Sequence, residues 1–150
     1  MPMAFSKFVA KYPGPEYGLY STAHDLSLFY QMMLNGGTYN GKRILSKASV
    51  EVATALHTAQ IEPAGHSPGM GYGLAWTVVR DPFGMLQLQS IGTFGHGGAF
   101  GTQGWMDPKR EIYYVLMVQR QGFGDGDALE MRKAVQDIGA GALAVTSASR

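Results

Sequence analysis

A glycine-rich segment in the second half of the chain limits the fold more than any other stretch. Residues 93–101 run Thr-Phe-Gly-His-Gly-Gly-Ala-Phe-Gly, and five glycines lie between positions 92 and 101. Glycines at this density let another backbone or a ligand approach the chain closely. His96 is the one ionisable side chain of the segment. The pattern fits a binding site, and it fits equally a tight turn or bulged edge strand whose histidine faces solvent.

Strand-like sequence precedes this segment. Large residues at alternate positions predict one strand over residues 72–79, because period two is the period of a strand: Tyr72, Leu74, Trp76 and Val78. We expect Asp81-Pro82-Phe83-Gly84 to turn the chain, and residues 85–90 to form a return strand.

Strand-like sequence also leads into and follows the glycine-rich segment. Residues 91–96 lead into the histidine, and residues 101–106 predict the next strand. Asp107-Pro108-Lys109-Arg110 predicts a hairpin turn. The unbroken apolar run 112–118 is typical of a strand covered on both faces.

Two helices are expected before the sheet. The first begins after Thr22, with Asp25 completing its cap, and ends at Gly36-Gly37; its apolar face follows the helical period, with Leu26, Phe29, Tyr30, Met33 and Leu34. Ser21 and His24 lie in its first turn, where capping and solvent exposure explain them better than catalysis. Asn40-Gly41 predicts a turn in a small hairpin.

The second helix is expected from Ser46 through His57. His57 and His66 lack a second histidine or a carboxylate at ligand spacing, so we expect no metal site and no cofactor.

A third helix is expected to close the chain and to pack on the sheet. Asp127 and Glu130 fit a capping box, and the predicted apolar face consists of Ala128, Met131, Val135, Ile138 and Ala142. The fold class is therefore α+β, with an antiparallel sheet of about five strands. We expect an irregular lead-in over residues 1–18, a single domain over 19–145 and a tail over 146–150.

Composition excludes several classes of function. A 45% apolar and 15% charged content suits a packed domain, and a net charge of +1 with scattered lysines and arginines gives no surface for nucleic acid. The absence of cysteine excludes disulfides and thiolate metal sites. No stretch is apolar enough for a membrane span or a signal-peptide core, so the expected location, as written, is the cytoplasm.

Several segments in a fixed order resemble one enzyme superfamily. Residues 95–120, GHGGAFGTQGWMDPKREIYYVLMVQR, together with GLYSTAHDL at 18–26 and LNGG at 34–37, resemble the serine β-lactamases, penicillin-binding proteins and related esterases. In that superfamily a strand beside the active site ends in Lys-Thr-Gly or in His-x-Gly. His96-Gly97-Gly98 would be this third motif. The resemblance covers roughly residues 16–140 and implies a partial β-lactamase-like fold.

The resemblance assigns roles to four residues. The N–H of Ala99, directly after the motif, would be one of the two donors that stabilise the oxyanion in acyl transfer. His96 would take the place of the motif lysine and offer a hydrogen bond or a positive charge to a substrate carboxylate or to the acid/base network. Gly97 and Gly98 would leave room for a small acyl or ester ligand along the strand.

The superfamily's other two motifs do not occur in the sequence. No lysine has a serine three residues before it, and no tyrosine or serine has an asparagine two residues after it. We therefore expect a truncated or partial hydrolase that is inactive alone and whose function belongs to a complete protein or to a complementing N-terminal chain. The alternative is a stand-alone, non-catalytic binding or scaffold module. The apolar run 112–118, as an edge strand, would also favour a homodimer.

Overall fold

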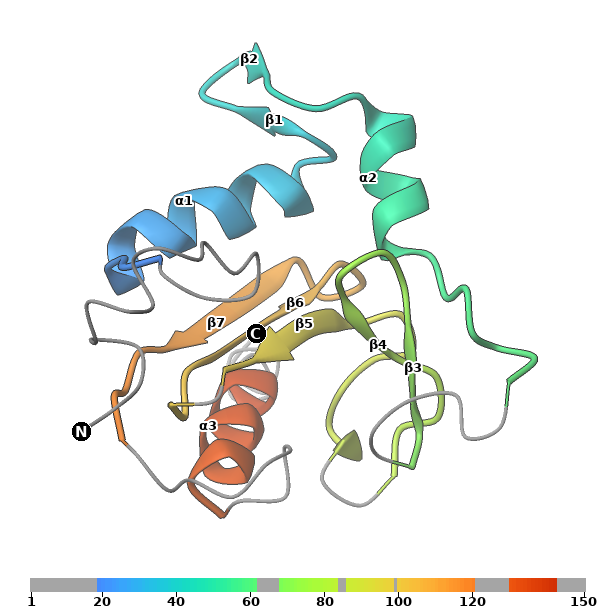
Figure 1. Cartoon of the computed structure of the whole chain (residues 1–150), viewed down its shortest axis with the longest axis vertical. Coiled ribbons are helices and arrows are strands. Elements are labelled where there is room, and N and C mark those ends of the chain that lie inside the picture. The colour runs from blue at the N-terminus through green and yellow to red at the C-terminus, as the bar shows by residue number, and fades with distance from the viewer. Residues whose placement is uncertain (1–18, 62–67, 84–85, 99, 121–129, 143–150) are drawn as a thin grey trace, which may run out of the picture.

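Five strands form an antiparallel sheet in the order in which they occur along the chain (Figure 1). They are β3 (Met70–Tyr72), β4 (Thr77–Val79), β5 (Phe94–Gly97), β6 (Gln103–Asp107) and β7 (Ile112–Leu116). The computed structural model describes residues 19–61, 68–83, 86–98, 100–120 and 130–142. Figure 1 shows α1 (Ala23–Leu34) over one face of the sheet and α3 (Glu130–Gly141) under the other. The predicted α+β class is confirmed.

The first helix forms as its sequence predicts. The Thr22 hydroxyl accepts the Asp25 backbone N–H at 3.0 Å, which satisfies one of the free donors at the start of α1. A small hairpin follows, with β1 (Thr38–Tyr39) paired to β2 (Lys42–Arg43). Its turn residues Asn40 and Gly41 both have positive φ, 47° and 73°, as a tight two-residue turn requires.

The second helix is shorter than predicted. α2 (Lys47–Thr54) is capped by the Ser46 hydroxyl, which accepts the Ser49 N–H at 2.9 Å. It ends before His57 because Ala55 takes an extended conformation with ψ 148°. The His57 N–H instead donates to the carbonyl of Tyr72 at 2.7 Å, so the chain after α2 lies along β3.

The single strand predicted over residues 72–79 is wrong, since the chain reverses within it. The Gly73 N–H donates to the Trp76 carbonyl at 2.8 Å, and Ala75 has a φ of 63°. The stretch is therefore a hairpin in which Tyr72 of β3 pairs with Thr77 of β4. A bond from the Leu74 N–H to the Ala53 carbonyl of α2, 2.8 Å long, holds the turn in place.

The return strand predicted over residues 85–90 is also wrong. In the described part of this stretch, the Leu86 N–H donates to Phe83 at 3.0 Å and the Gln89 N–H donates to Leu86 at 2.8 Å. These are local turns. The partner of β4 is instead β5, with Val78 opposite Phe94. Figure 1 shows the turn region beside the lower end of β3 and β4.

Each face of the sheet carries its own core. Under α1 the buried cluster consists of Tyr30, Met32, Met33, Val50, Val78, Phe94 and Met106. On the α3 face it consists of Met70, Val79, Leu86 and Trp105. β7 contacts both α1 and α3, which confirms the prediction that this apolar run is covered on both faces.

Two glycines let aromatic rings lie directly on the sheet. A Cβ on Gly104 would lie 2.1 Å from the Tyr30 ring on the α1 face. A Cβ on Gly95 would lie 2.8 Å from the Trp105 ring and 2.2 Å from the Gly104 carbonyl oxygen. Real Cβ atoms do not approach so closely, so a side chain at either position would push a helix or a strand away.

The face of α3 that packs on the sheet differs from the predicted one. Its buried residues are Arg132, Gln136 and Ala140, whereas Met131 is 37% exposed and Ile138 is 73% exposed. Polar side chains face inward here because the sheet surface beneath them offers polar partners, as described below. Ala142 is exposed directly after the end of α3. Ala128, the predicted lead-in and the predicted tail lie outside the described residues.

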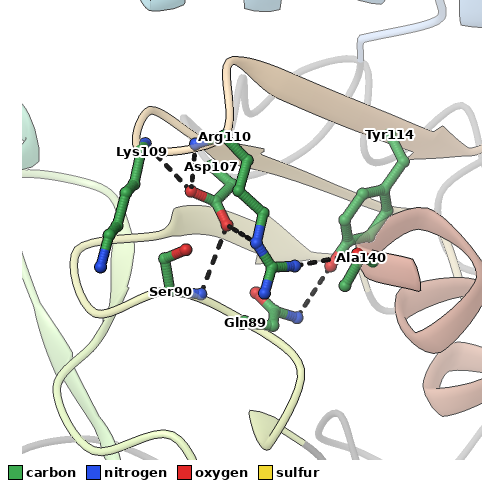
Figure 2. Close-up of polar contacts among 7 residues, drawn as sticks. All are labelled: Gln89, Ser90, Asp107, Lys109, Arg110, Tyr114 and Ala140. Carbon is green, nitrogen blue, oxygen red and sulfur yellow. Dashed lines mark hydrogen bonds and ion pairs between the residues drawn. The ribbon is translucent and has the colours of Figure 1, made fainter. Parts of the chain in front are cut away.

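A hydrogen-bonded network closes the sheet at the turn between β6 and β7 (Figure 2). The buried carboxylate of Asp107 accepts backbone N–H groups from Ser90, Lys109 and Arg110 at 3.3, 3.0 and 3.1 Å. The Arg110 side chain lies 3.7 Å from the same carboxylate and donates to the Ala140 carbonyl at the end of α3. One aspartate thus joins the β6–β7 turn, the segment before β5 and α3.

Candidate functional site

The predicted site lies where β5 ends, at the opposite end of the sheet from Asp107. His96 pairs with Gly104 of β6, and Gly97 pairs with Gln103. The ladder continues one step further, because the Gly98 N–H donates to the Thr102 carbonyl at 2.7 Å. The Gly101 N–H then donates back to the Gly98 carbonyl at 3.0 Å, which closes a four-residue turn.

His96 is exposed at this strand end. Its Nδ1 lies 2.6 Å from the carbonyl oxygen of Gly97. Since a carbonyl only accepts, Nδ1 carries the proton, and Nε2 of the neutral ring is left as an acceptor. The ring therefore presents its basic nitrogen away from the strand.

The pleat puts His96 on the same face of the sheet as α1. Phe94, two residues earlier, packs in the core under α1, and alternate residues of a strand share a face. Register also brings Trp76 beside it: Thr77 pairs with Gly95, so the preceding residue, Trp76, lies next to His96 across the strands. Trp76 and Phe94 therefore share this face of the sheet with His96.

These rings form a connected aromatic cluster. The Trp76 ring lies 5.5 Å from Phe94, 6.3 Å from Tyr30 and 6.1 Å from Phe29, measured between centroids. The Phe29 ring stacks on it at an interplanar angle of 20° and is 41% exposed. Burial raises the pKa of the Tyr30 hydroxyl above its ordinary value of 10.0, because the low-polarity surroundings disfavour the phenolate.

On the other face, the same strand end rests on a polar network that the sequence did not predict. Arg132 of α3 is 3% exposed, and its guanidinium donates to the Gly98 carbonyl. The Gln103 amide nitrogen donates to the Arg132 carbonyl at 3.0 Å. Its amide oxygen accepts from Gln136 at 3.1 Å and from the Trp105 indole at 3.2 Å. The sequence signal that could have predicted this burial is the helical period of α3, which puts Arg132, Gln136 and Ala140 on one side of the helix.

The structure brings together three of the four predicted site residues. His96, Gly97 and Gly98 are consecutive at the end of β5, with His96 exposed and the two glycines half-buried. Ala99, the predicted oxyanion donor, lies outside the described residues.

The other singled-out side chains lie away from this strand end. Ser21 and His24 are exposed at the start of α1. The His57 ring bonds to the Val52 carbonyl of α2 at 2.7 Å, and His66 lies outside the described residues. In the described part of the chain, no three histidine, cysteine or acidic side chains gather as metal ligands would.

Comparison with known proteins agrees with this arrangement of motif and sheet. A profile of the Beta-lactamase family matches residues 2–137. The chain belongs to the Beta-lactamase family. The sheet, its flanking helices and the His96-Gly97-Gly98 strand end are thus parts of a serine β-lactamase and penicillin-binding protein fold. None of the helices within the described ranges is long and apolar enough to cross a bilayer.

Curated relatives are considerably longer than this chain. Protein Rv1367c of Mycobacterium tuberculosis is 35% identical over 112 residues, which are 68% of this chain and 28% of that protein. A putative D-alanyl-D-alanine carboxypeptidase of Salmonella enteritidis is 32% identical over 109 residues, 69% of this chain and 22% of that protein. The chain therefore spans under a third of the length of these relatives.

Solved structures share the fold. A putative 6-aminohexanoate-dimer hydrolase from Bacillus anthracis superposes with a TM-score of 0.62 at 24% identity, over 85% of this chain and 30% of that one. The superposition corresponds to a partial β-lactamase-like fold.

Proposed function

We propose that this chain supplies one wall of the acyl-binding cleft of a β-lactamase-like serine hydrolase, and that the nucleophile comes from a segment carrying Ser-x-x-Lys. The observation that supports this most is the end of β5, where an exposed His96 precedes the half-buried Gly97 and Gly98. The sequence holds no serine three residues before a lysine. Without a nucleophile, only residual acceleration from binding and oxyanion donors remains.

In this proposal each residue of the motif has one task. His96 offers Nε2 as a hydrogen-bond acceptor, or a positive charge when protonated, to a substrate carboxylate or to the acid/base network. The N–H of Ala99 is one of the two oxyanion donors. Gly97 and Gly98 let a small ester or amide lie along the strand. The Trp76 ring belongs to the cluster on the same face of the sheet as His96, and the Phe29 ring stacks on it.

Reconstitution tests the proposal. The partner is the part of a relative that lies outside the matched segment, and the relative is selected as one whose unmatched part carries Ser-x-x-Lys. Each chain alone should remain unlabelled by a fluorophosphonate probe and should not hydrolyse nitrocefin or p-nitrophenyl esters. When they are mixed or fused, the serine of the partner should be labelled and at least one substrate class hydrolysed, because the oxyanion donors and the nucleophile then share a cleft.

The complete relative serves as the positive control for labelling. A mixture in which the two chains bind each other yet the serine stays unlabelled would contradict the proposal. The stand-alone binding or scaffold module would then be the better account. Labelling of Ser21, Ser46 or Ser90 in the isolated chain would contradict the assignment of the nucleophile.

We also propose that two copies of the chain pair through β7. This strand is the last of the sheet within the described residues, and its sequence carries no charge or proline to weaken edge pairing. Both faces are covered, by α1 and α3, so the outer edge of β7, which pairs with no strand among the described residues, is the surface proposed for a second strand. Two antiparallel β7 strands would form a two-fold interface, with the same patch on each copy.

Light scattering at micromolar concentration tests the pairing. The unmodified chain should be a dimer, and Met117→Lys should shift it toward monomer, because Met117 is 38% exposed directly after β7. Tyr114 and Val115 are unsuitable positions, since both pack inward. Ile138→Lys is the control, a charge at a 73% exposed position on α3. A monodisperse monomer of the unmodified chain would exclude the pairing.

A further inference from the structure

The end of a buried tyrosine lies near His96 on the same face of the sheet. Tyr30 belongs to α1 and is 6% exposed. A Cβ on Gly104 of β6 would overlap the Tyr30 hydroxyl oxygen and the ring carbons beside it, so the end of the phenol lies directly on Gly104. A glycine inside a strand often marks the close approach of another group, and here that group is a hydroxyl.

Strand pairing limits how far this hydroxyl can be from the histidine. Gly104 lies directly opposite His96 in the β5–β6 ladder. Both residues are on the α1 face, since Phe94 and Met106, two positions away on each strand, pack in the core under α1. The Cβ positions of directly opposite residues are about 5 Å apart, which places the Tyr30 hydroxyl within about 8 Å of the His96 Cβ.

The Tyr30 hydroxyl forms no hydrogen bond with any residue that the structure describes. Burial alone raises its pKa, and no hydrogen bond or charge within the described part of the chain contributes. A buried tyrosine hydroxyl usually has a partner, because leaving one unpaired is costly. A phenylalanine would keep the ring contacts without that cost. The hydroxyl is therefore available to a partner other than the described residues.

The surroundings of this hydroxyl are aromatic. The Tyr30 ring lies 6.3 Å from Trp76 and 6.4 Å from Tyr113, both edge to face, and 5.9 Å from Phe29. Since Phe29 is 41% exposed, the cluster reaches the surface. Surroundings of low polarity disfavour a charged group, whether it is the phenolate itself or a carboxylate beside it.

We infer that the Tyr30 hydroxyl is a ligand-binding donor of the cleft: it donates a hydrogen bond to the uncharged carbonyl oxygen of an amide or ester held between His96 and the aromatic cluster. The inference rests on the proposed function for the position of the cleft. It narrows the ligands proposed there, because a carboxylate at this hydroxyl would exchange its hydration for aromatic rings.

Binding of a neutral and a charged probe to the full chain tests the inference without any catalysis. Phenylacetamide and phenylacetate are similar in shape, and only the first is uncharged. At pH 8, phenylacetamide should bind at least about fivefold more tightly and should shift the Tyr30 ring resonances saturably in nuclear magnetic resonance spectra. Tyr30→Phe should weaken phenylacetamide binding about fivefold, the effect of one neutral hydrogen bond, and leave phenylacetate binding unchanged.

Tyr113→Phe is the matched control. It makes the same change on a neighbouring ring that lies opposite Met106 instead of Gly104, so the affinity for phenylacetamide should stay that of the unmodified chain. An equal loss in the two variants, an unchanged affinity in Tyr30→Phe, or tighter binding of phenylacetate would overturn the inference. If Tyr30→Phe fails to fold, the unmodified chain decides. The absence of a saturable Tyr30 shift would overturn the inference, since the hydroxyl would then be hydrated only.

Failure of the proposed function is a separate result. If the reconstituted hydrolase shows no activity, the proposed function fails, while the affinities of the single chain still decide whether Tyr30 binds a carbonyl group. An active hydrolase together with probe binding that does not depend on Tyr30 would leave the proposed function standing and overturn this inference.

Discussion

The two ends of the five-stranded sheet are built in opposite ways. At the β6–β7 turn, the buried Asp107 carboxylate has three backbone donors and the Arg110 side chain around it (Figure 2). At the end of β5, His96 is exposed and its ring bonds only to the carbonyl of the next residue among the contacts observed. The first end stabilises the fold, whereas the second leaves the His96 ring exposed.

The largest effect is expected at the Asp107 end. Asp107→Ala should lower the free energy of unfolding by about 3 kcal/mol, because it removes a buried carboxylate and leaves three backbone N–H donors without their acceptor. Asp107→Asn keeps one amide oxygen and should lose about half as much. Urea denaturation measures both. A loss below about 1 kcal/mol for Asp107→Ala would show that the Asp107 hydrogen bonds contribute little to the stability of the fold.

Within β5, the main stability cost should lie at the glycine under Trp105. Gly95→Ala should lower the free energy of unfolding by about 2–3 kcal/mol, because its Cβ would meet backbone as well as a ring. Gly141→Ala is the control: it lies at the end of α3 with nothing within 4 Å, and should be neutral or slightly stabilising. Similar urea midpoints for the two variants would contradict this close-packing argument.

The buried Tyr30, which lies in the aromatic cluster with Trp76, should make the free energy of unfolding depend on pH in the alkaline range. Burial raises the pKa of Tyr30 in the folded state, so above pH 10 the unfolded chain loses this proton first and stability falls as the pH rises. Tyr30→Phe removes the ionisation. Its free energy of unfolding should therefore decline less between pH 9 and 11 than that of the unmodified chain. Parallel declines would indicate that the Tyr30 hydroxyl is hydrated.

The smallest effect is expected at His96 itself. His96→Ala should change the free energy of unfolding by less than about 0.5 kcal/mol, the usual range for an exposed side chain. His57→Ala, at another exposed histidine bonded to a backbone carbonyl, is the matched comparison. A loss above about 1 kcal/mol at His96 alone would mean that its ring is part of the fold rather than available to a ligand.

Local signals in the sequence predicted the elements whose ends are set by local chemistry. The Thr22 cap and the Asn40-Gly41 turn depend on residues within one turn of each other, and both occur as expected. The reversal after Tyr72 depends instead on α2: the Leu74 N–H needs the Ala53 carbonyl, and Gly73 lies against the same backbone. Alternation of apolar residues cannot reveal a turn that a distant helix holds in place.

The sequence predicted the part of the candidate site on β5, and it did not predict the part contributed by α3. His96, Gly97 and Gly98 are contiguous, so their sequence alone brings them together. Arg132 was missed because apolar residues mark the opposite side of α3, and the rule that hydrophobic residues are buried ranks arginine last. Its burial follows from the Gly98 carbonyl and Gln103 beneath it, which are polar partners that become visible only once α3 is packed on the sheet.

The sequential order of the sheet has a consequence for how the chain folds. Each strand from β3 to β6 pairs with the strand that follows it along the chain. The sheet can therefore grow by successive hairpins, each closing a short loop, rather than wait for two distant segments to meet. Contacts that are close along the chain favour rapid folding. During synthesis, β5 and β6 can pair soon after β6 is made, so the His96 strand end can form before α3 is complete.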